Sequence, residues 1–172
     1  MKKLLIVVVI IALGAGWYFW SKGDSSNQII QIAPDTSRPN PANATFNIED
    51  ENITLKNGVN DTGTTETSLS NTLAYSDVNG DGKNDAAVIL IQSGGGSGTF
   101  VYLAAYISGN VNYKGSEAIF IGDRVAPKSL SINKGVITLT YLDRKADEPM
   151  AAEPTVLTTK NFVYKAGTLE EK

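Results

Sequence analysis

The sequence predicts a mainly β domain, built as a single antiparallel sandwich or rolled sheet and preceded by an N-terminal transmembrane or signal helix. Three observations support this fold class. The first 20 residues contain an uninterrupted apolar run, whereas residues 43–172 alternate apolar and polar side chains with a period near two. No stretch of a dozen residues in that second region shows a helical period of 3.6. Short turns between the apolar runs favour hairpins, which pair their strands antiparallel.

Residues 1–20 determine the predicted location. Lys2 and Lys3 precede the apolar run Leu4–Leu13, small residues follow, and residues 17–20 are all aromatic. A charged start, a short apolar run and small residues are typical of a cleaved signal peptide. The favoured interpretation is a membrane anchor, because residues 4–20 are just long enough to span and end in aromatic side chains suited to the membrane interface. Either way the domain lies outside the cytoplasm, in a single-pass membrane protein or, after cleavage, in a secreted or periplasmic one.

Residues 21–42 are predicted to form an extended stalk. They carry Pro34, Pro39 and Pro41 and few side chains that build a core. The extracytoplasmic domain therefore covers residues 43–172.

Within the domain, the continuous apolar run Ala86–Ile91 predicts a central strand buried on both faces. Asn57-Gly58 and Lys134-Gly135 predict hairpin turns between alternating segments. Only Glu66–Leu73 has a pattern that allows a helical turn or two. The domain is expected to contain seven to nine short strands.

Composition narrows the chemistry of this domain. The chain of 172 residues contains no cysteine and no histidine, which excludes thiol nucleophiles, disulfides, Ser-His-Asp triads and Cys/His zinc sites. A net charge of −3 without a basic run makes nucleic acid a poor partner. Any metal must bind through oxygen, which favours Ca²⁺, Mg²⁺ or Mn²⁺.

The strongest local motif occupies residues 77–85, between two predicted strands. Oxygen-bearing side chains stand at positions 1, 3, 5 and 9 of the motif, and a glycine stands at position 6. Alternate residues of a tightly curled loop point inward, so these oxygens are expected to converge with the position-7 carbonyl. The motif predicts a weak Ca²⁺ site, with a Kd of roughly 10⁻⁴–10⁻³ M, formed by Asp77, Asn79, Asp81, Lys83 and Asp85. A hairpin turn without metal is the alternative.

This motif resembles known calcium loops. It is similar to the loops of EF-hand and dockerin proteins, but Val88 stands where an EF-hand carries its bidentate glutamate, and the flanking residues have a strand pattern. It is more similar to the DxNxDGxxD loops between strands of FG-GAP and VCBS domains. Those families repeat the unit to build a propeller, and this chain has one copy, so the resemblance implies a calcium loop only.

Charged loops form a second candidate surface. Clustered charge on loops favours recognition, and the candidate residues are Asp123, Arg124, Asp143, Arg144 and Glu148. Ion pairs that pin the loops are the favoured interpretation, and a recognition surface is the alternative. Two of these carboxylates would also serve a glycosidase-like mechanism if they stood about 5–9 Å apart in a cleft.

Four motifs in sequence order carry a wider resemblance. They are NGDGxxD at 79–85, GGGSGTF at 94–100, GDR at 122–124 and YLDRKxxEPM at 141–150. Over residues 73–154 the chain resembles a family of small bacterial envelope proteins of uncharacterised activity. The resemblance implies an anchored envelope domain and no particular chemistry.

The predicted function is a membrane-anchored, extracytoplasmic binding or structural module with one structural calcium loop and no enzymatic activity. Its expected partners are the membrane, through the N-terminal helix, and an envelope protein or glycan, but no nucleic acid. Two alternatives stay open. One is a carboxylate-based hydrolase of envelope polysaccharide. The other is a protein-binding inhibitor of an envelope enzyme, which predicts an exposed apolar or aromatic patch.

Overall fold

The computed structural model describes residues 38–172, so the predicted anchor or signal helix and most of the predicted stalk lie outside the described residues. Within this range no helix has the length and apolar character that crossing a membrane requires. A short 3₁₀ helix, η1 (Pro41–Asn43), precedes the first strand. The strands are β1 (Thr45–Ile48), β2 (Glu51–Thr54), β3 (Val59–Asp61), β4 (Thr65–Ser76), β5 (Asp85–Gly94), β6 (Thr99–Ile107), β7 (Lys114–Gly115), β8 (Ile119–Asp123), β9 (Ala126–Asn133), β10 (Val136–Asp143), β11 (Val156–Lys165) and β12 (Thr168–Glu171).

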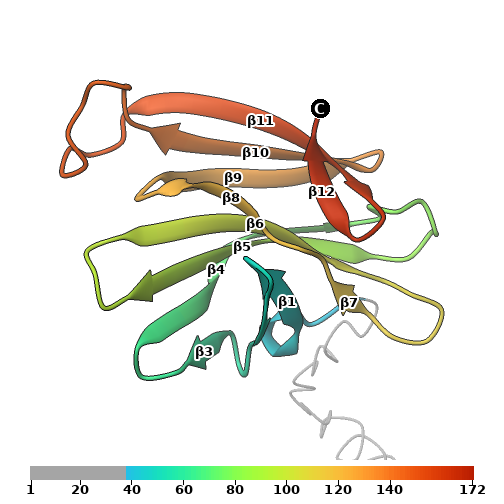
Figure 1. The fold of residues 1–172 in the computed structure, drawn as a ribbon. Coiled ribbons are helices and arrows are strands. Elements are labelled where there is room, and N and C mark those ends of the chain that lie inside the picture. Colours follow the sequence, from blue (N-terminus) through green and yellow to red (C-terminus); the bar gives the residue numbers. More distant parts are fainter. Residues whose placement is uncertain (1–37) are drawn as a thin grey trace, which may run out of the picture. The chain divides into compact units, whose positions relative to one another are not determined.

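The strands of residues 38–172 form three antiparallel sheets, none of them closed (Figure 1). The smallest is the β1–β2 hairpin. The central sheet has the order β3-β4-β5-β6-β7, with β8 also paired to β6, and the third sheet has the order β12-β11-β10-β9. The prediction of a mainly β domain with antiparallel pairing is therefore confirmed.

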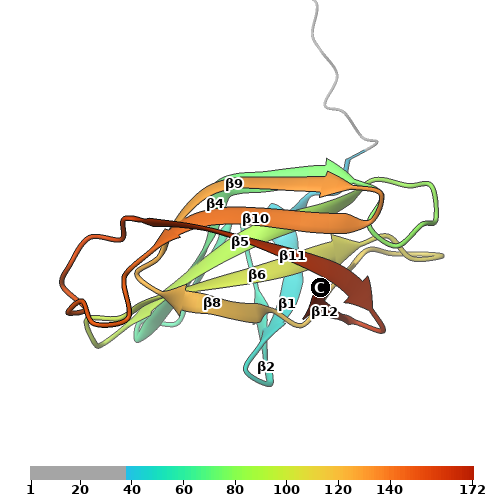
Figure 2. The ribbon, with the colours of Figure 1, turned by 90° about the horizontal axis from the view of Figure 1, so that it is seen from above.

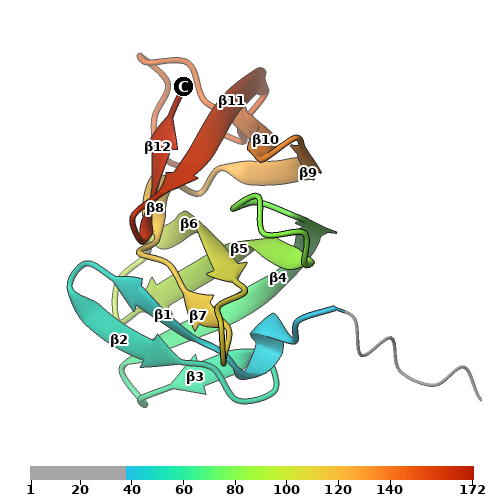
Figure 3. The same cartoon turned by 90° about the vertical axis from the view of Figure 1, so that its right-hand side faces the viewer.

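The central sheet is covered on both faces. Residues 86–90 of β5 are buried and Ile91 is half-buried, as the apolar run Ala86–Ile91 predicts. Because alternate side chains of a strand point to opposite faces, Ile89 shares one core with Leu139 of the third sheet, and Leu90 shares another with Phe46 of the β1–β2 hairpin. Figure 3 shows β4–β6 between the hairpin and strands β9–β12.

Two predicted hairpin turns are confirmed. Asn57 and Gly58 have φ angles of 53° and 86°, and Lys134 and Gly135 have φ angles of 49° and 75°. Type I′ turns need positive φ at both central residues, and their twist matches that of the flanking strands.

The helical turn expected at Glu66–Leu73 is wrong. This segment belongs to β4, which pairs with β3 on one side and with β5 on the other. Pairing on both edges outweighs the weak local helical pattern, and the only trace of irregularity is a register shift between Leu69 and Leu73.

Residues 39–42, the predicted end of the stalk, pack on the domain. Pro39 and Pro41 are buried. The carbonyl oxygen of Ala42 accepts a hydrogen bond from the Gly58 N–H at 2.7 Å, and the Arg38 guanidinium lies 5.2 Å from the centre of the Tyr75 ring.

The β5–β6 hairpin places two loop regions at opposite ends of the central sheet (Figure 2). The paired register runs from Ala86 with Tyr106 to Ser93 with Thr99. At about 3.3 Å per residue, the seven steps along the strand from Asp85 to Gln92 separate the two ends by roughly 23 Å. The 77–85 loop lies at the first end. Gln92 and its register partner Phe100 lie toward the second.

Candidate functional site

The 77–85 loop connects β4 to β5 and is folded by its own side chains. Gly80 and Gly82 have φ angles of 83° and 81°, which residues with a Cβ rarely adopt. The two carboxylate oxygens of Asp77 accept hydrogen bonds from the N–H groups of Gly80, at 2.6 Å, and Gly82, at 2.8 Å. The first aspartate of the motif therefore holds both glycines in place.

The next two oxygen-bearing residues repeat this arrangement. Asn79 Oδ1 accepts the N–H of Asp81 at 3.0 Å, and Asp81 Oδ1 accepts the N–H of Lys83 at 2.9 Å. The second oxygen of Asp81 accepts the Ser108 hydroxyl at 2.7 Å. The Ser108 hydroxyl and then the Lys83 N–H lower the pKa of Asp81, because both donate to its ionised form.

Asp85 is fully buried at the base of the loop. Its Oδ2 accepts the N–H groups of Val78, at 2.8 Å, and Asn79, at 3.3 Å, while its Oδ1 accepts the N–H of Ser108 at 2.7 Å. A buried carboxylate is tolerated when several donors satisfy it. Asp85 therefore ties both ends of the loop to the segment after β6.

Further contacts join the loop to residues 108–113. The Asn79 amide donates to the Ser108 carbonyl at 3.2 Å, and the Lys83 ammonium donates to the Gly109 carbonyl at 3.0 Å. The Tyr113 hydroxyl donates to the Asn84 carbonyl at 2.9 Å. The site thus combines two segments that are more than 20 residues apart in sequence.

The oxygens of the 77–85 loop do not form a complete cage of carboxylates. Among residues 38–172, no three acidic, histidine or cysteine side chains gather closely enough to hold a metal ion. Asp77, Asn79 and Asp81 share one loop, whereas N–H donors occupy both oxygens of Asp85. Each oxygen of Asp77 accepts one hydrogen bond and keeps a second lone pair for a cation. A cation would therefore have its side-chain ligands in the first part of the motif, at Asp77, Asn79 and Asp81.

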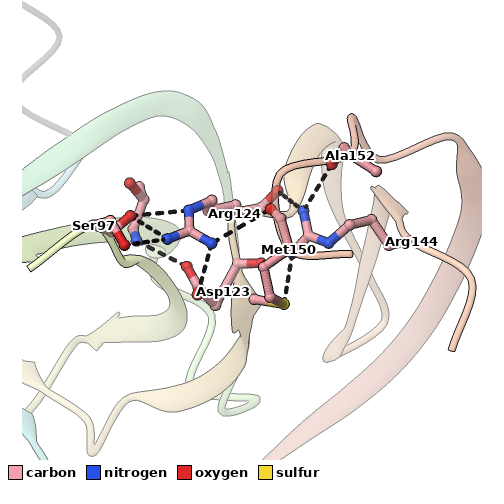
Figure 4. Close-up of polar contacts among 7 residues, drawn as sticks. Ser97, Asp123, Arg124, Arg144, Met150 and Ala152 are labelled. Carbon is pink, nitrogen blue, oxygen red and sulfur yellow. Dashed lines mark hydrogen bonds and ion pairs between the residues drawn. The ribbon is translucent and has the colours of Figure 1, made fainter. Parts of the chain in front are cut away.

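The charged loops at the other end of the sheet meet around two arginines (Figure 4). Arg124 donates through Nε to the Ser97 carbonyl at 2.9 Å and forms an ion pair with Asp123 at 3.4 Å. It also donates to the Met150 carbonyl at 3.4 Å. Arg124 therefore connects the β5–β6, β8–β9 and β10–β11 loops.

Arg144 makes a second set of contacts to backbone oxygens. It donates to the carbonyls of Asp123, Arg124 and Ala152. Beside the two arginines is an open pocket of about 570 Å³, whose other lining residues are Ser97 and residues 150–154. Because the guanidinium N–H groups already bind carbonyls, the arginines act as links between loops.

The remaining predicted recognition residues make local contacts. Asp143 Oδ1 accepts the N–H of Arg144 at 2.8 Å, and Glu148 Oε2 accepts the N–H of Lys145 at 3.0 Å. That N–H donor and the nearby Lys145 charge lower the pKa of Glu148. A general acid needs the opposite shift, so Glu148 does not have the property that the hydrolase alternative needs.

Sequence analysis did not identify a small aromatic pocket at the same end of the sheet. Its volume is about 210 Å³, and its lining consists of Glu49, Gln92, Phe100, Tyr102 and Phe120. Phe100 and Phe120 are 38% and 51% exposed, and their ring centres are 6.2 Å apart. Phe100 and Tyr102 lie two residues apart on β6, so the sequence predicts that they share one face of the sheet. Phe120 joins them only because β8 pairs with β6, and the sequence around Phe120 does not indicate that pairing.

Comparisons of the chain with protein-family models, with curated proteins and with solved structures found no match.

Proposed function

We propose that this protein is a non-enzymatic binding or structural module, an open β sandwich whose 77–85 loop binds one Ca²⁺ ion. The ion fixes the β4–β5 loop against the segment after β6. The N-terminal apolar segment anchors the module in a membrane, with the domain outside the cytoplasm.

The observation that carries the calcium proposal is the hydrogen bonding of Asp77 and Asp81. Three backbone N–H groups and the Ser108 hydroxyl hold their carboxylates within one loop. Two carboxylates on one tight loop repel each other, and a divalent cation between them relieves that repulsion. Oxygen ligands from a curled loop of this spacing suit Ca²⁺.

A structural role is supported by where the loop is attached. Asp85, Ser108 and Tyr113 couple the loop to buried strands, so an ion there would stiffen one end of the β5–β6 hairpin. With a Kd near 10⁻⁴ M and about 1 mM Ca²⁺, binding would add roughly 1.4 kcal/mol to the free energy of unfolding. This is a useful increment for a domain whose total stability is about 5–15 kcal/mol.

The absence of enzymatic activity is supported by the charged loops. The guanidinium groups of Arg124 and Arg144 donate hydrogen bonds to backbone carbonyls. The pKa of Glu148 is lowered, so Glu148 is not suited to act as a general acid. These contacts favour rigid loops over acid–base chemistry.

Thermal unfolding with and without calcium tests the proposal. At 1 mM Ca²⁺ the protein should melt about 5 °C higher than in EDTA. Asp81→Ala should remove this difference. Asp61→Ala is a matched control. Like Asp81, Asp61 accepts a hydrogen bond from the backbone N–H of the residue two positions later, here Gly63 at 2.7 Å, but it lies outside the 77–85 loop. Equal melting of the unaltered protein in Ca²⁺ and EDTA would rule out the calcium loop.

A further inference from the structure

We propose that the aromatic pocket formed by Glu49, Gln92, Phe100, Tyr102 and Phe120 binds an organic cation that carries an alkylated ammonium group. The pocket lies at the opposite end of the β5–β6 hairpin from the 77–85 loop. This proposal is therefore independent of calcium binding, and either can fail without the other.

Three aromatic rings gather on the face of the central sheet that packs against the β1–β2 hairpin: Tyr102 is buried there, and Phe100 and Phe120 are exposed at its edge. Tyr102 and Phe120 are register partners on β6 and β8, with ring centres 5.5 Å apart in an edge-on arrangement. Phe100 lies two residues before Tyr102, and its ring is tilted by 58° to that of Phe120. Rings at steep angles around a small space form the kind of aromatic cage that holds alkylated ammonium groups.

The β1–β2 turn adds a carboxylate to this cage. Glu49 Oε1 accepts the Tyr102 hydroxyl at 2.9 Å, which fixes the carboxylate beside the rings. Within residues 38–172, no salt bridge neutralises Glu49. Asp50 and Glu51 follow directly and are exposed, so the turn that carries Glu49 is acidic. Charge complementarity therefore favours a cation.

The backbone at this turn is unusual in a way that supports a binding role. Glu49 and Asp50 have φ angles of 50° and 68°. The two-residue turn they form normally contains Asn-Gly, because both positions need positive φ. Residues held in such conformations cluster at ligand sites. Here the turn places the Glu49 carboxylate at the Tyr102 hydroxyl.

A glycine holds one ring in position. A Cβ on Gly98 would lie 2.6 Å from the Phe100 Cζ atom, so the ring of Phe100 folds back over the backbone at Gly98. A residue with a side chain there would displace this ring. Gly98 is thus a positioning residue for the cage.

The size and chemistry of the pocket select the kind of occupant. Pockets for drug-sized ligands measure about 300–1,000 Å³, and this one measures about 210 Å³. It fits one small head group. A trimethylammonium group presents apolar methyl groups to the rings and a positive charge to Glu49, and therefore satisfies both parts of the lining.

Titration of the full-length protein with choline chloride, followed by calorimetry or by the NMR signals of the aromatic rings, tests the proposal. We expect saturable binding of choline. The neutral isostere 3,3-dimethyl-1-butanol should bind at least about tenfold more weakly, because it has the shape without the charge. Glu49→Gln and Phe120→Leu should each weaken choline binding about tenfold. Phe120→Leu keeps an apolar side chain at a half-exposed position, so the fold should be retained.

Control variants separate the cage from general surface effects. Val111→Ala removes an apolar side chain that is 89% exposed and lies outside the pocket, and should leave choline binding unchanged. Gly98→Ala should weaken choline binding without removing any lining residue. Equal affinity for choline and its neutral isostere, or no saturable choline binding, would overturn the proposal. Binding of arginine methyl ester without binding of choline would also overturn it, by pointing to a basic peptide.

Discussion

The buried Asp85 carboxylate accepts a hydrogen bond from the backbone N–H of Ser108 at 2.7 Å. This contact joins the start of β5 to the residue after β6. The other oxygen of Asp85 holds Val78 and Asn79, so a single side chain organises both segments of the loop region.

Removing the Asp85 carboxylate should be strongly destabilising. Asp85→Ala leaves three N–H groups without their acceptor in a buried place, which should lower the free energy of unfolding by about 3 kcal/mol. Urea denaturation measures this loss. Asp147→Ala, on an exposed loop, is the control and should change stability by no more than about 0.5 kcal/mol. A loss as small as that of the control would contradict the anchoring role of Asp85.

The lowered pKa of Asp81 predicts a dependence of stability on acid. Its pKa in the folded protein lies below the ordinary value of 3.8, so ionised Asp81 stabilises the folded state above pH 3.8 and loses this contribution as the pH falls through the folded pKa. In EDTA, the stability difference between the unaltered protein and Asp81→Asn should therefore shrink below pH 3.8. Urea midpoints measured from pH 7 down to pH 2 check this. A constant difference over the whole range would be inconsistent with the Ser108 and Lys83 contacts.

Several features of the 77–85 loop can be predicted from its own sequence, and others cannot. The spacing of Asp77, Asn79 and Asp81 predicts a curled loop with glycines at its bends, and the structure has these bends. The partners Ser108 and Tyr113 lie more than 20 residues away, so only the pairing of β5 with β6 brings them close. Burial of Asp85 has the same cause, since its neighbours come from both strands.

Some of the turns can be predicted from the local sequence, and others cannot. Asn57-Gly58 and Lys134-Gly135 are predictable because each pair ends in glycine, which adopts positive φ without steric cost. The turn at Glu49 and Asp50 has the same backbone without a glycine, so this local rule does not identify it. The aromatic pocket was missed for a related reason: its rings come from β6 and β8, and its carboxylate comes from the β1–β2 turn.

Close packing at Gly115 predicts a severe effect of a single methyl group. A Cβ on Gly115 would lie 2.1 Å from the backbone oxygen of Thr45 and 2.8 Å from the Phe46 ring. Gly115→Ala should therefore separate β7 from β1 and destabilise the protein by about 1–3 kcal/mol or more. Thermal unfolding measures the effect. At Gly96 nothing lies within 4 Å of an added Cβ, so Gly96→Ala should melt almost as the unaltered protein does. Similar melting of both variants would refute the close contact.

The Tyr102 hydroxyl should lose its proton only at a higher pH than an ordinary tyrosine. Burial, followed by its hydrogen bond to Glu49, raises the pKa of Tyr102 to about 12. Because the folded pKa lies above the ordinary 10.0, folding loses stability as the pH rises above 10. In Glu49→Gln the pKa of Tyr102 should fall but stay above 10, since burial is the larger cause. A titration followed by tyrosinate absorbance checks this, with the Tyr102 signal assigned by subtracting the titration of a Tyr102→Phe variant. If the pKa of Tyr102 were unchanged in Glu49→Gln, the hydrogen bond to Glu49 would be contradicted.

Terbium luminescence excited through tyrosine tests the calcium loop most directly, because Tb³⁺ occupies Ca²⁺ sites and Tyr113 contacts the loop at Asn84. The account predicts saturable Tb³⁺ emission that Ca²⁺ displaces at concentrations of roughly 10⁻⁴–10⁻³ M. Asp77→Asn combined with Asp81→Asn should abolish this emission, and Tyr113→Phe should dim it without changing the displacement. Emission of equal strength from the unaltered protein and the double variant would show that the loop does not bind the ion.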